Sequence, residues 1–270
     1  MPHACLDDVE LFYTDEGDGP AVLLVHGLGA DSHDWMWQIP ELAPWHRTIT
    51  VDLRGHGASS VPARGYAIED YARDLVGLLD ELDVDRAVAV GHSLGGLIVA
   101  ALAIGWPDRV AAVVEVDPAY GYDPAWPEGF RAVAAAIDVQ GPEATLAAME
   151  SFWVPTTPPH LRCWHRRRAQ GMRAHVLAQS MRAWADAPGT VLGDESAAYL
   201  AQRRCPVLAV YADASRVAWE RSTTSSPLSR AVAFEGVGHW LHQERPADFT
   251  DLVLGWTTSL ELERSGRPAQ

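Results

Sequence analysis

Short apolar runs alternate with amphipathic segments along the first part of the chain. The runs are rich in aliphatic and β-branched residues and end at turn residues, as buried strands do. We predict strands at 9–14, 21–25, 47–51, 87–90 and 110–116, and helices at 68–82 and 94–104. The helix at 68–82 repeats apolar residues at the spacing of one helical face: Tyr71, Leu75, Leu78, Leu79 and Leu82. Apolar strands separated by helices predict an α/β fold with a parallel sheet covered on both faces.

The pattern changes between residues 120 and 204, where the sequence carries no strand signal. Helical stretches are predicted there at 131–137, 143–153 and 172–184, with a basic run at 162–168. After this segment the alternation returns, with strands at 206–211 and 231–234 and a closing helix at 246–260. The sequence therefore predicts one sheet domain, residues 1–119 and 205–270, interrupted by a helical insertion at 120–204.

Composition and charge narrow the class of protein. Of the 270 residues, 48% are hydrophobic and 21% are charged, which excludes a disordered chain. The net charge of −15 argues against nucleic acid and anionic membranes as partners, because both are themselves negative. Three cysteines without paired spacing indicate neither a disulfide framework nor a zinc site. A polar N-terminus and apolar runs too short for a membrane span predict a cytoplasmic protein.

Residues 91–95 read Gly-His-Ser-Leu-Gly, which fits the pattern G-x-S-x-G. The pattern follows a predicted strand and opens a predicted helix, and this is the context of a sharp turn that exposes a nucleophilic serine. Glycines at both ends let the strand and the helix approach closely, and a helix N-terminus favours developing negative charge. We therefore predict that Ser93 is a nucleophile.

Two glycine-containing segments offer the partners that such a serine needs. The segment HGLG at 26–29 follows a predicted strand, and its glycines let a main-chain N–H point into the site. An oxyanion needs two such donors, and we predict the N–H groups of Leu28 and Leu94. The segment GVGH at 236–239 follows the last predicted strand. Its histidine, His239, is the predicted general base, on a loop able to reach the serine.

Together these motifs give the chain a clear likeness: it resembles the α/β-hydrolase family. The resemblance rests on HGLG at 26–29, DLRGHGASS at 52–60, GHSLGG at 91–96, PVLAVYAD at 206–213 and GVGHWLHQERP at 236–246. It implies an eight-stranded, mostly parallel sheet, a helical cap inserted after the sixth strand, and a Ser–acid–His triad that uses no metal or organic cofactor. The serine nucleophile is unlike the haloalkane dehalogenases and epoxide hydrolases of this fold, which use aspartate.

The chain departs from the common pattern of the family at the triad acid. Most relatives carry G-x-x-D after the strand that here reads PVLAVY, whereas residues 212–215 read Ala-Asp-Ala-Ser. Serine cannot hold the negative charge that stabilises an imidazolium. Asp117 ends the strand at 110–116, where zearalenone lactonases and haloalkane dehalogenases carry their acid, and Asp213 lies two residues before the common position. We favour Asp117 as the acid and keep Asp213 as the alternative.

The insertion at 120–204 corresponds to the cap of the family, which covers the active site and sets specificity. It holds four tryptophans that we take as candidate substrate-binding residues, Trp126, Trp153, Trp164 and Trp184. Aromatic linings are usual for ligand pockets, so these residues predict a small hydrophobic, ring-containing substrate. Each of these tryptophans, taken alone, could equally serve to pack the cap against the sheet domain. The sequence leaves the oligomeric state open.

The leading interpretation is a serine hydrolase that acts on an ester or a lactone. A carbon–carbon bond hydrolase and a cofactor-free perhydrolase share the Ser–His–Asp pattern, so the sequence does not separate them. A non-catalytic receptor for a small ligand is an interpretation of a different class, because fold alone does not establish function. Ser93 and His239 argue for an enzyme, and the displaced acid argues for a receptor.

Overall fold

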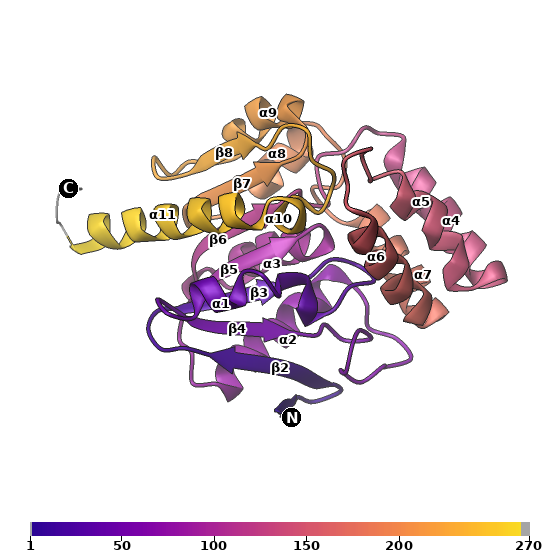
Figure 1. The fold of residues 1–270 in the computed structure, drawn as a ribbon, viewed down its shortest axis with the longest axis horizontal. Helices are drawn as coiled ribbons and strands as arrows, with labels where there is room; N and C mark the ends of the chain where they lie inside the picture. Colours follow the sequence, from indigo (N-terminus) through magenta and orange to yellow (C-terminus); the bar gives the residue numbers. More distant parts are fainter. Residues whose placement is uncertain (1, 266–270) are drawn as a thin grey trace.

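The computed structural model describes residues 2–265, with side chains through residue 260. One sheet of eight strands runs through the molecule in the order β1-β2-β4-β3-β5-β6-β7-β8 (Figure 1). The strands are β1 (His3–Cys5), β2 (Glu10–Glu16), β3 (Ala21–Val25), β4 (Arg47–Val51), β5 (Ala87–His92), β6 (Val110–Val116), β7 (Val207–Tyr211) and β8 (Arg230–Ala233). β2 pairs antiparallel with β1 and β4, and the remaining pairs are parallel. The predicted α/β class with a mostly parallel sheet is confirmed.

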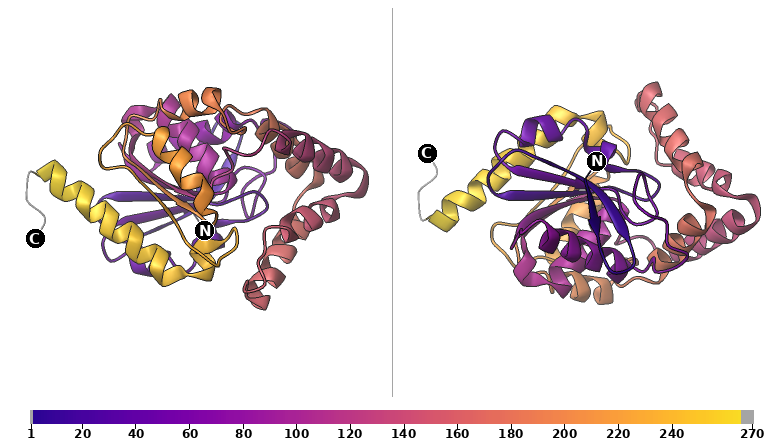
Figure 2. Two further views of the ribbon diagram at one scale, coloured as in Figure 1. Left: turned by 90° about the horizontal axis from the view of Figure 1, so that it is seen from above. Right: turned by 90° about the horizontal axis from the view of Figure 1, so that it is seen from below.

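Helices cover both faces of this sheet. α2 (Ile68–Glu81) and α3 (Leu94–Gly105) pack on one face, and α1 (Ile39–Leu42) and α11 (Pro246–Ser265) pack on the other (Figure 2). The predicted apolar face of α2 is buried at Tyr71, Leu75, Leu78 and Leu79. Each face of the sheet therefore has its own apolar core, and the carboxyl ends of the parallel strands stay free to carry polar side chains.

The chain between β6 and β7 is helical. It forms α4 (Trp126–Gln140), α5 (Leu146–Glu150), α6 (Pro159–Gly171), α7 (Ala174–Asp186) and α8 (Asp194–Leu200). α4 packs along α7, and the rings of Phe130 and Trp184 stack with their centroids 3.8 Å apart. In the views of Figures 1 and 2, α4 to α7 lie together at one end of the sheet. This end is where α3 begins, directly after Ser93.

Several observed elements differ from the sequence prediction. The polar strand β1 has no apolar signal, and it forms because its main chain pairs with β2. α4 begins at Trp126 rather than at 131, because Pro127 suits the first turn of a helix, where its missing N–H costs nothing. The helix predicted at 143–153 is instead a 3₁₀ turn (Pro142–Thr145) followed by α5, which ends at Glu150. Two short helices, α9 (Val217–Ser222) and α10 (Leu241–Glu244), complete the chain.

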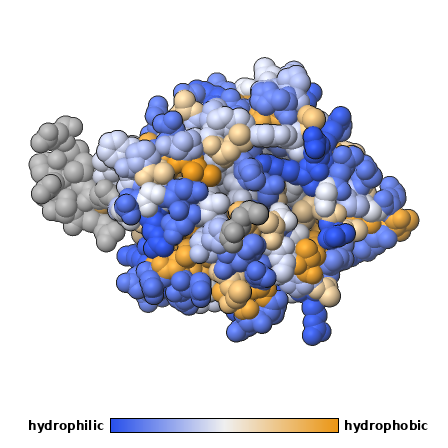
Figure 3. Space-filling view, turned by 60° about the horizontal axis from the view of Figure 1, so that its bottom comes forward, coloured by the Kyte–Doolittle hydropathy of each residue, from blue (hydrophilic) through white to orange (hydrophobic). Residues whose placement is uncertain are grey.

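Polar residues dominate the face of the molecule seen in Figure 3, and apolar residues gather there only in small groups. The large exposed hydrophobic side chains of the described residues are spread along the chain: Met36, Trp45, Val61, Trp126, Val139, Trp164 and Leu192. Within residues 2–265, no helix combines the length and the apolar character that crossing a membrane requires.

Candidate active site

The turn between β5 and α3 holds Ser93 in an unusual backbone conformation. Ser93 has φ 53° and ψ −115°, a region that residues with a side chain rarely occupy. Such strain persists only where the surroundings enforce it, and here two glycines do so. A Cβ atom on Gly91 would lie 2.2 Å from the carbonyl oxygen of Gly95, and one on Gly95 would lie 2.3 Å from that of Val25. The tight strand-to-helix turn predicted from the G-x-S-x-G pattern is therefore present in the fold.

We expect Gly95→Ala to distort this turn. The added methyl group meets a main-chain oxygen that cannot move aside, so the free energy of unfolding should fall by about 3 kcal/mol. Gly105→Ala, at the other end of α3, is the matched control, because a Cβ there meets no atom within 4 Å. The control should stay within about 1 kcal/mol of wild type. Urea unfolding followed by tryptophan fluorescence measures both, and equal stability of the two variants would contradict the close approach.

His239 lies beside Asp117 at the same end of the sheet. The Nδ1 of His239 is 2.6 Å from Oδ2 of Asp117, and the other carboxylate oxygen accepts the N–H of Ala212 at 3.1 Å. Burial raises the pKa of Asp117, but the hydrogen bond from His239 and the nearby Arg216 outweigh this effect and hold the pKa below its usual range. Asp117 is therefore an ionised acceptor, and Nδ1 of His239 carries the proton that it accepts. This leaves Nε2 of His239 for proton exchange with a substrate or a nucleophile.

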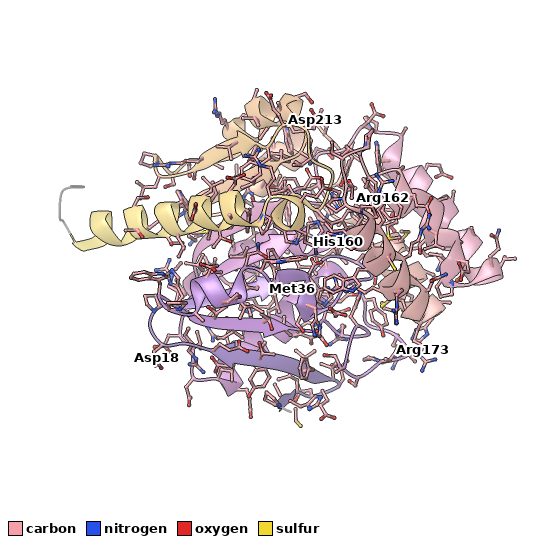
Figure 4. All side chains as sticks on the ribbon, viewed as in Figure 1. Asp18, Met36, His160, Arg162, Arg173 and Asp213 are labelled. Carbon is pink, nitrogen blue, oxygen red and sulfur yellow. The ribbon has the colours of Figure 1, made fainter. Side chains whose placement is uncertain are left out.

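The alternative acid Asp213 and the neighbouring histidine His242 take no part in the contact between Asp117 and His239. Asp213 is exposed near α9, where its Oδ1 accepts the N–H of Ser215 at 2.9 Å (Figure 4). It caps a short 3₁₀ turn and makes no hydrogen bond to His239. His242 is fully buried, and burial lowers its pKa to about 4. Of the two candidate acids, the structure brings Asp117 to His239.

A small apolar cavity of about 80 Å³ is bounded by both Ser93 and His239. Its walls come from the loop after β3, from α5 to α7, and from the loop after β8. The apolar lining includes Leu28, Ala148, Met149, Phe152, Leu177, Met181, Trp184 and Trp240. A second hollow of about 330 Å³ shares Ala148, Phe152, Met181 and Trp184 with it. Ser93 and His239 thus line one small space that is suited to apolar groups.

The two predicted oxyanion donors flank Ser93. Leu94 is the first residue of α3, and Leu28 lines the cavity. The loop that carries Leu28 passes close to the serine, because a Cβ on Gly27 would lie 3.1 Å from Cβ of Ser93. Within residues 2–265, neither the Leu28 nor the Leu94 N–H donates to a main-chain or side-chain acceptor. Both groups are therefore available to an oxygen of a ligand.

The four tryptophans proposed as substrate contacts fall into two groups. Trp184 lines the cavity around Ser93, and Trp126 lines the adjoining hollow. Trp153 and Trp164 line neither of these two cavities, so the structure does not bring them together with Ser93. Trp153 donates to Nδ1 of His165, a buried residue of α6, at 3.2 Å. Trp164 is 37% exposed, with its ring 6.0 Å from that of Trp37.

Several lining residues were missed by the sequence prediction. Phe152 stacks on His239, with the two ring centroids 4.8 Å apart, whereas the sequence prediction names its neighbour Trp153 as the substrate contact. Thr145, Ala148, Met149 and Phe152 all line the cavity and are spaced i, i+3, i+4 and i+7. That spacing places the four residues on one face of a helix, and it is the sequence pattern from which they could have been predicted. Size and aromatic character alone do not show which way a side chain points.

Comparisons with known proteins give the same fold. The sequence profile of a family described as alpha/beta hydrolase fold matches residues 20–246. Bifunctional epoxide hydrolase 2 of Sus scrofa is 38% identical over 112 residues, which is 40% of this chain and 20% of that protein. The chain spans between 20% and 58% of the length of the first curated relatives it matches.

Two solved structures match almost the whole chain. A thermophilic esterase from Thermogutta terrifontis is 28% identical, with a TM-score of 0.83 over 93% of this chain and 94% of that one. The enol-lactonase from Burkholderia xenovorans LB400 is 25% identical, with a TM-score of 0.84 over 95% of this chain and all of the other. More than nine-tenths of the chain therefore shares its fold with these two proteins.

Proposed function

Because this chain belongs to the α/β-hydrolase fold family, we propose that it is a serine hydrolase that cleaves an ester or a lactone of a hydrophobic, ring-containing small molecule. The observation that carries the proposal is the meeting of Ser93 and His239 in one apolar cavity, with Asp117 hydrogen-bonded behind the histidine. A receptor needs the cavity but has no use for an ionised carboxylate aligned on a histidine. The likeness to an esterase and an enol-lactonase supports the same reaction class.

In the first half of the proposed reaction, Oγ of Ser93 attacks the carbonyl carbon of the substrate. Nε2 of His239 takes the hydroxyl proton as the new C–O bond forms, and Asp117 stabilises the resulting imidazolium. The carbonyl oxygen becomes an oxyanion and accepts hydrogen bonds from the N–H groups of Leu28 and Leu94. The tetrahedral intermediate then collapses, the ester C–O bond breaks, and His239 gives its proton to the leaving alcohol.

In the second half, water replaces the alcohol. His239 removes a proton from the water as it attacks the acyl group on Ser93, and the same two N–H groups hold the new oxyanion. Collapse of this intermediate releases the carboxylic acid and returns the proton from His239 to Oγ of Ser93. A lactone follows the same steps, with the alcohol and the acid remaining in one product molecule.

The two cavities suggest which part of the substrate goes where. A volume of about 80 Å³ beside Ser93 is small against the about 300–1,000 Å³ of typical ligand pockets, so only a short acyl group fits. The hollow of about 330 Å³ is open, apolar and lined by Trp126 and Phe130. We propose that it receives the ring-containing part. In this account residues 120–204 act as the cap, because α5, α6 and α7 supply much of the lining.

A panel of 4-nitrophenyl and naphthyl esters tests this arrangement. We expect kcat/KM for an acetate to exceed that for a decanoate by about tenfold or more, because the longer chain exceeds the cavity. Ala148→Leu should lower kcat/KM for naphthyl acetate by about tenfold, since Ala148 lines both cavities. Ala147→Leu is the matched control on the exposed side of α5 and should stay within about twofold. Equal rates for both acyl lengths, or equal effects of the two variants, would contradict the assignment.

A further inference from the structure

Two buried glutamates face a single arginine where the helical insertion joins the sheet domain. Glu115 is the last but one residue of β6, and Glu220 belongs to α9. Nη1 of Arg203 lies 2.7 Å from Oε1 of Glu115, and its Nη2 lies 3.0 Å from Oε1 of Glu220. None of the three side chains is more than 1% exposed. If both carboxyl groups were ionised, one negative charge would be buried without a partner.

The neighbouring groups do not supply a second positive charge. Tyr120, Tyr211 and Cys205 surround the two glutamates, and burial raises the pKa of each, so all three are neutral. Arg216 lies near the Tyr211 ring, but it donates to main-chain oxygens, and its charge is matched by Asp117. One positive charge is therefore available to two carboxyl groups.

The hydroxyl of Tyr120 indicates where a second proton lies. Its oxygen is 2.7 Å from Oε2 of Glu115 and 3.0 Å from Oε2 of Glu220. Each of these oxygen–oxygen contacts needs a proton between its two atoms, and a tyrosine hydroxyl carries only one. The other proton must come from a carboxyl group, which then donates to the tyrosine oxygen. A carboxylic acid, a hydroxyl and a carboxylate thus form one hydrogen-bonded chain.

Glu115 is the member of the pair that carries this proton. The carboxylate of Glu220 accepts a hydrogen bond from Tyr211 at 2.6 Å and lies 2.9 Å from the hydroxyl of Thr223, and such donors favour an ionised carboxylate. Among the described residues, the carboxyl group of Glu115 meets only Arg203 and the tyrosine hydroxyl. Burial, together with the neighbouring Glu220, raises the pKa of Glu115 to about 7 against the opposing effect of Arg203. Glu220 then balances the charge of Arg203.

These side chains join both ends of the helical insertion to the sheet domain. Of the insertion at 120–204, Tyr120 is the first residue and Arg203 the last but one. Nε of Arg203 also donates to the main-chain oxygen of Leu200, the last residue of α8, at 2.8 Å. The two glutamates belong to the sheet domain on either side. A change in their charge therefore acts on both connections at once.

We propose that four residues form a pH-sensitive anchor for the helical insertion, with one proton shared between two carboxyl groups: Glu115, Tyr120, Arg203 and Glu220. Loss of this proton leaves a buried negative charge without a partner, and the ends of the insertion loosen to admit water to it. The inference does not depend on the proposed reaction, because none of the four residues lines the cavity around Ser93.

Glu115→Gln tests for the proton, because the glutamine side chain stays neutral. An unfolded glutamate ionises near about pH 4.3, whereas folded Glu115 keeps its proton up to about pH 7. The resulting stability is fully present below the pKa of the unfolded glutamate and is lost as the pH rises through the pKa of the folded state. We expect the folding equilibrium constant of wild type, relative to Glu115→Gln, to fall by up to about tenfold per pH unit between about pH 5 and 7. Urea unfolding measures it, with Glu41→Gln on α1 as the exposed comparison variant. A ratio that does not change with pH overturns the inference.

A second substitution counts the charges. At pH 8, Glu115→Gln leaves Arg203 balanced by Glu220, so its folding constant should be at least that of wild type. Adding Glu220→Gln leaves the arginine buried without a carboxylate, and the folding constant should fall by about a hundredfold or more, to the point of unfolding. Two ordinary salt bridges would lose stability at each substitution. That result, a Glu115→Gln protein that does not fold, or a double variant as stable as the single one overturns the inference.

Proteinase K measures the anchoring itself. At pH 8.5 we expect it to cleave wild type within residues 120–204 about threefold faster or more than Glu115→Gln, because opening exposes the main chain. At pH 6.0 the two proteins should be cleaved at equal rates, since the wild type then holds its proton. Mass spectrometry locates the first cuts. Equal rates at both pH values, or first cuts outside the insertion, overturn the proposed anchor.

Discussion

Ser93→Ala is expected to lower kcat for 4-nitrophenyl acetate by about 10⁵-fold, because the variant loses the hydroxyl that forms the acyl-enzyme in the proposed reaction. The serine lies in the cavity at a strained turn, and its Oγ donates to no acceptor in the described part of the chain. Its removal therefore costs no internal hydrogen bond. We expect the melting temperature to stay within about 2 °C of wild type.

The control for this substitution is Ser222→Ala, at the exposed C-terminal end of α9. It should keep wild-type kcat. Initial rates of the three purified proteins at saturating ester, with thermal unfolding by circular dichroism, give the comparison. A Ser93→Ala variant that is folded and retains more than about a tenth of the wild-type rate would falsify the assignment of the nucleophile.

Asp117→Asn is expected to lower kcat by about 10³- to 10⁴-fold, and Asp213→Asn to leave it within about twofold. The asparagine retains the size of the side chain but cannot stabilise an imidazolium. Asp117 is 2.6 Å from Nδ1 of His239, whereas the exposed Asp213 accepts only the nearby N–H of Ser215. The two single variants form a matched pair. The opposite order of effects would return the triad acid to the strand that most relatives use.

The same pair gives an independent readout through stability. The pKa of Asp117 in the fold is below its ordinary value, so ionised Asp117 stabilises the folded state above about pH 3.9, the pKa of an unperturbed aspartate. This contribution is lost as the pH falls through the lower pKa of the folded state. We therefore expect the difference in free energy of unfolding between wild type and Asp117→Asn to be largest near neutral pH and to shrink in acid. Asp213→Asn is the comparison variant in the same urea-unfolding experiment.

The sheet was predictable because its strands carry their own signal. Strands β3, β4 and β6 have the predicted bounds, since they are largely buried and are rich in aliphatic and β-branched residues. β1 could not be predicted, because main-chain hydrogen bonds hold this polar edge strand and they do not require any particular pattern of side chains. The broken helix before Glu150 depends on packing against other helices, which local propensity does not contain.

The candidate site was predictable as a set of residues but not as a geometry. The glycine pattern around Ser93 indicated the turn, because only glycine fits where a Cβ would meet main-chain oxygen. The sequence favours Asp117 over Asp213 but leaves both open, because each follows a strand and the choice depends on which carboxylate reaches His239. Trp153 and Trp184 are the same residue type, but the side chain of Trp153 points toward His165 and that of Trp184 lines the cavity. Direction is set by tertiary packing.

Reaction with a fluorophosphonate, followed by peptide mass spectrometry, tests the central claim most directly. Oγ of an activated serine attacks the phosphorus, fluoride leaves, and a stable phosphonyl ester remains. The account predicts one adduct per chain, on Ser93 in the peptide that contains residues 91–95, absent in His239→Ala and slowed in Asp117→Asn. A folded protein that stays unmodified, or that carries the adduct on another side chain, would contradict the account and favour a receptor for small apolar ligands.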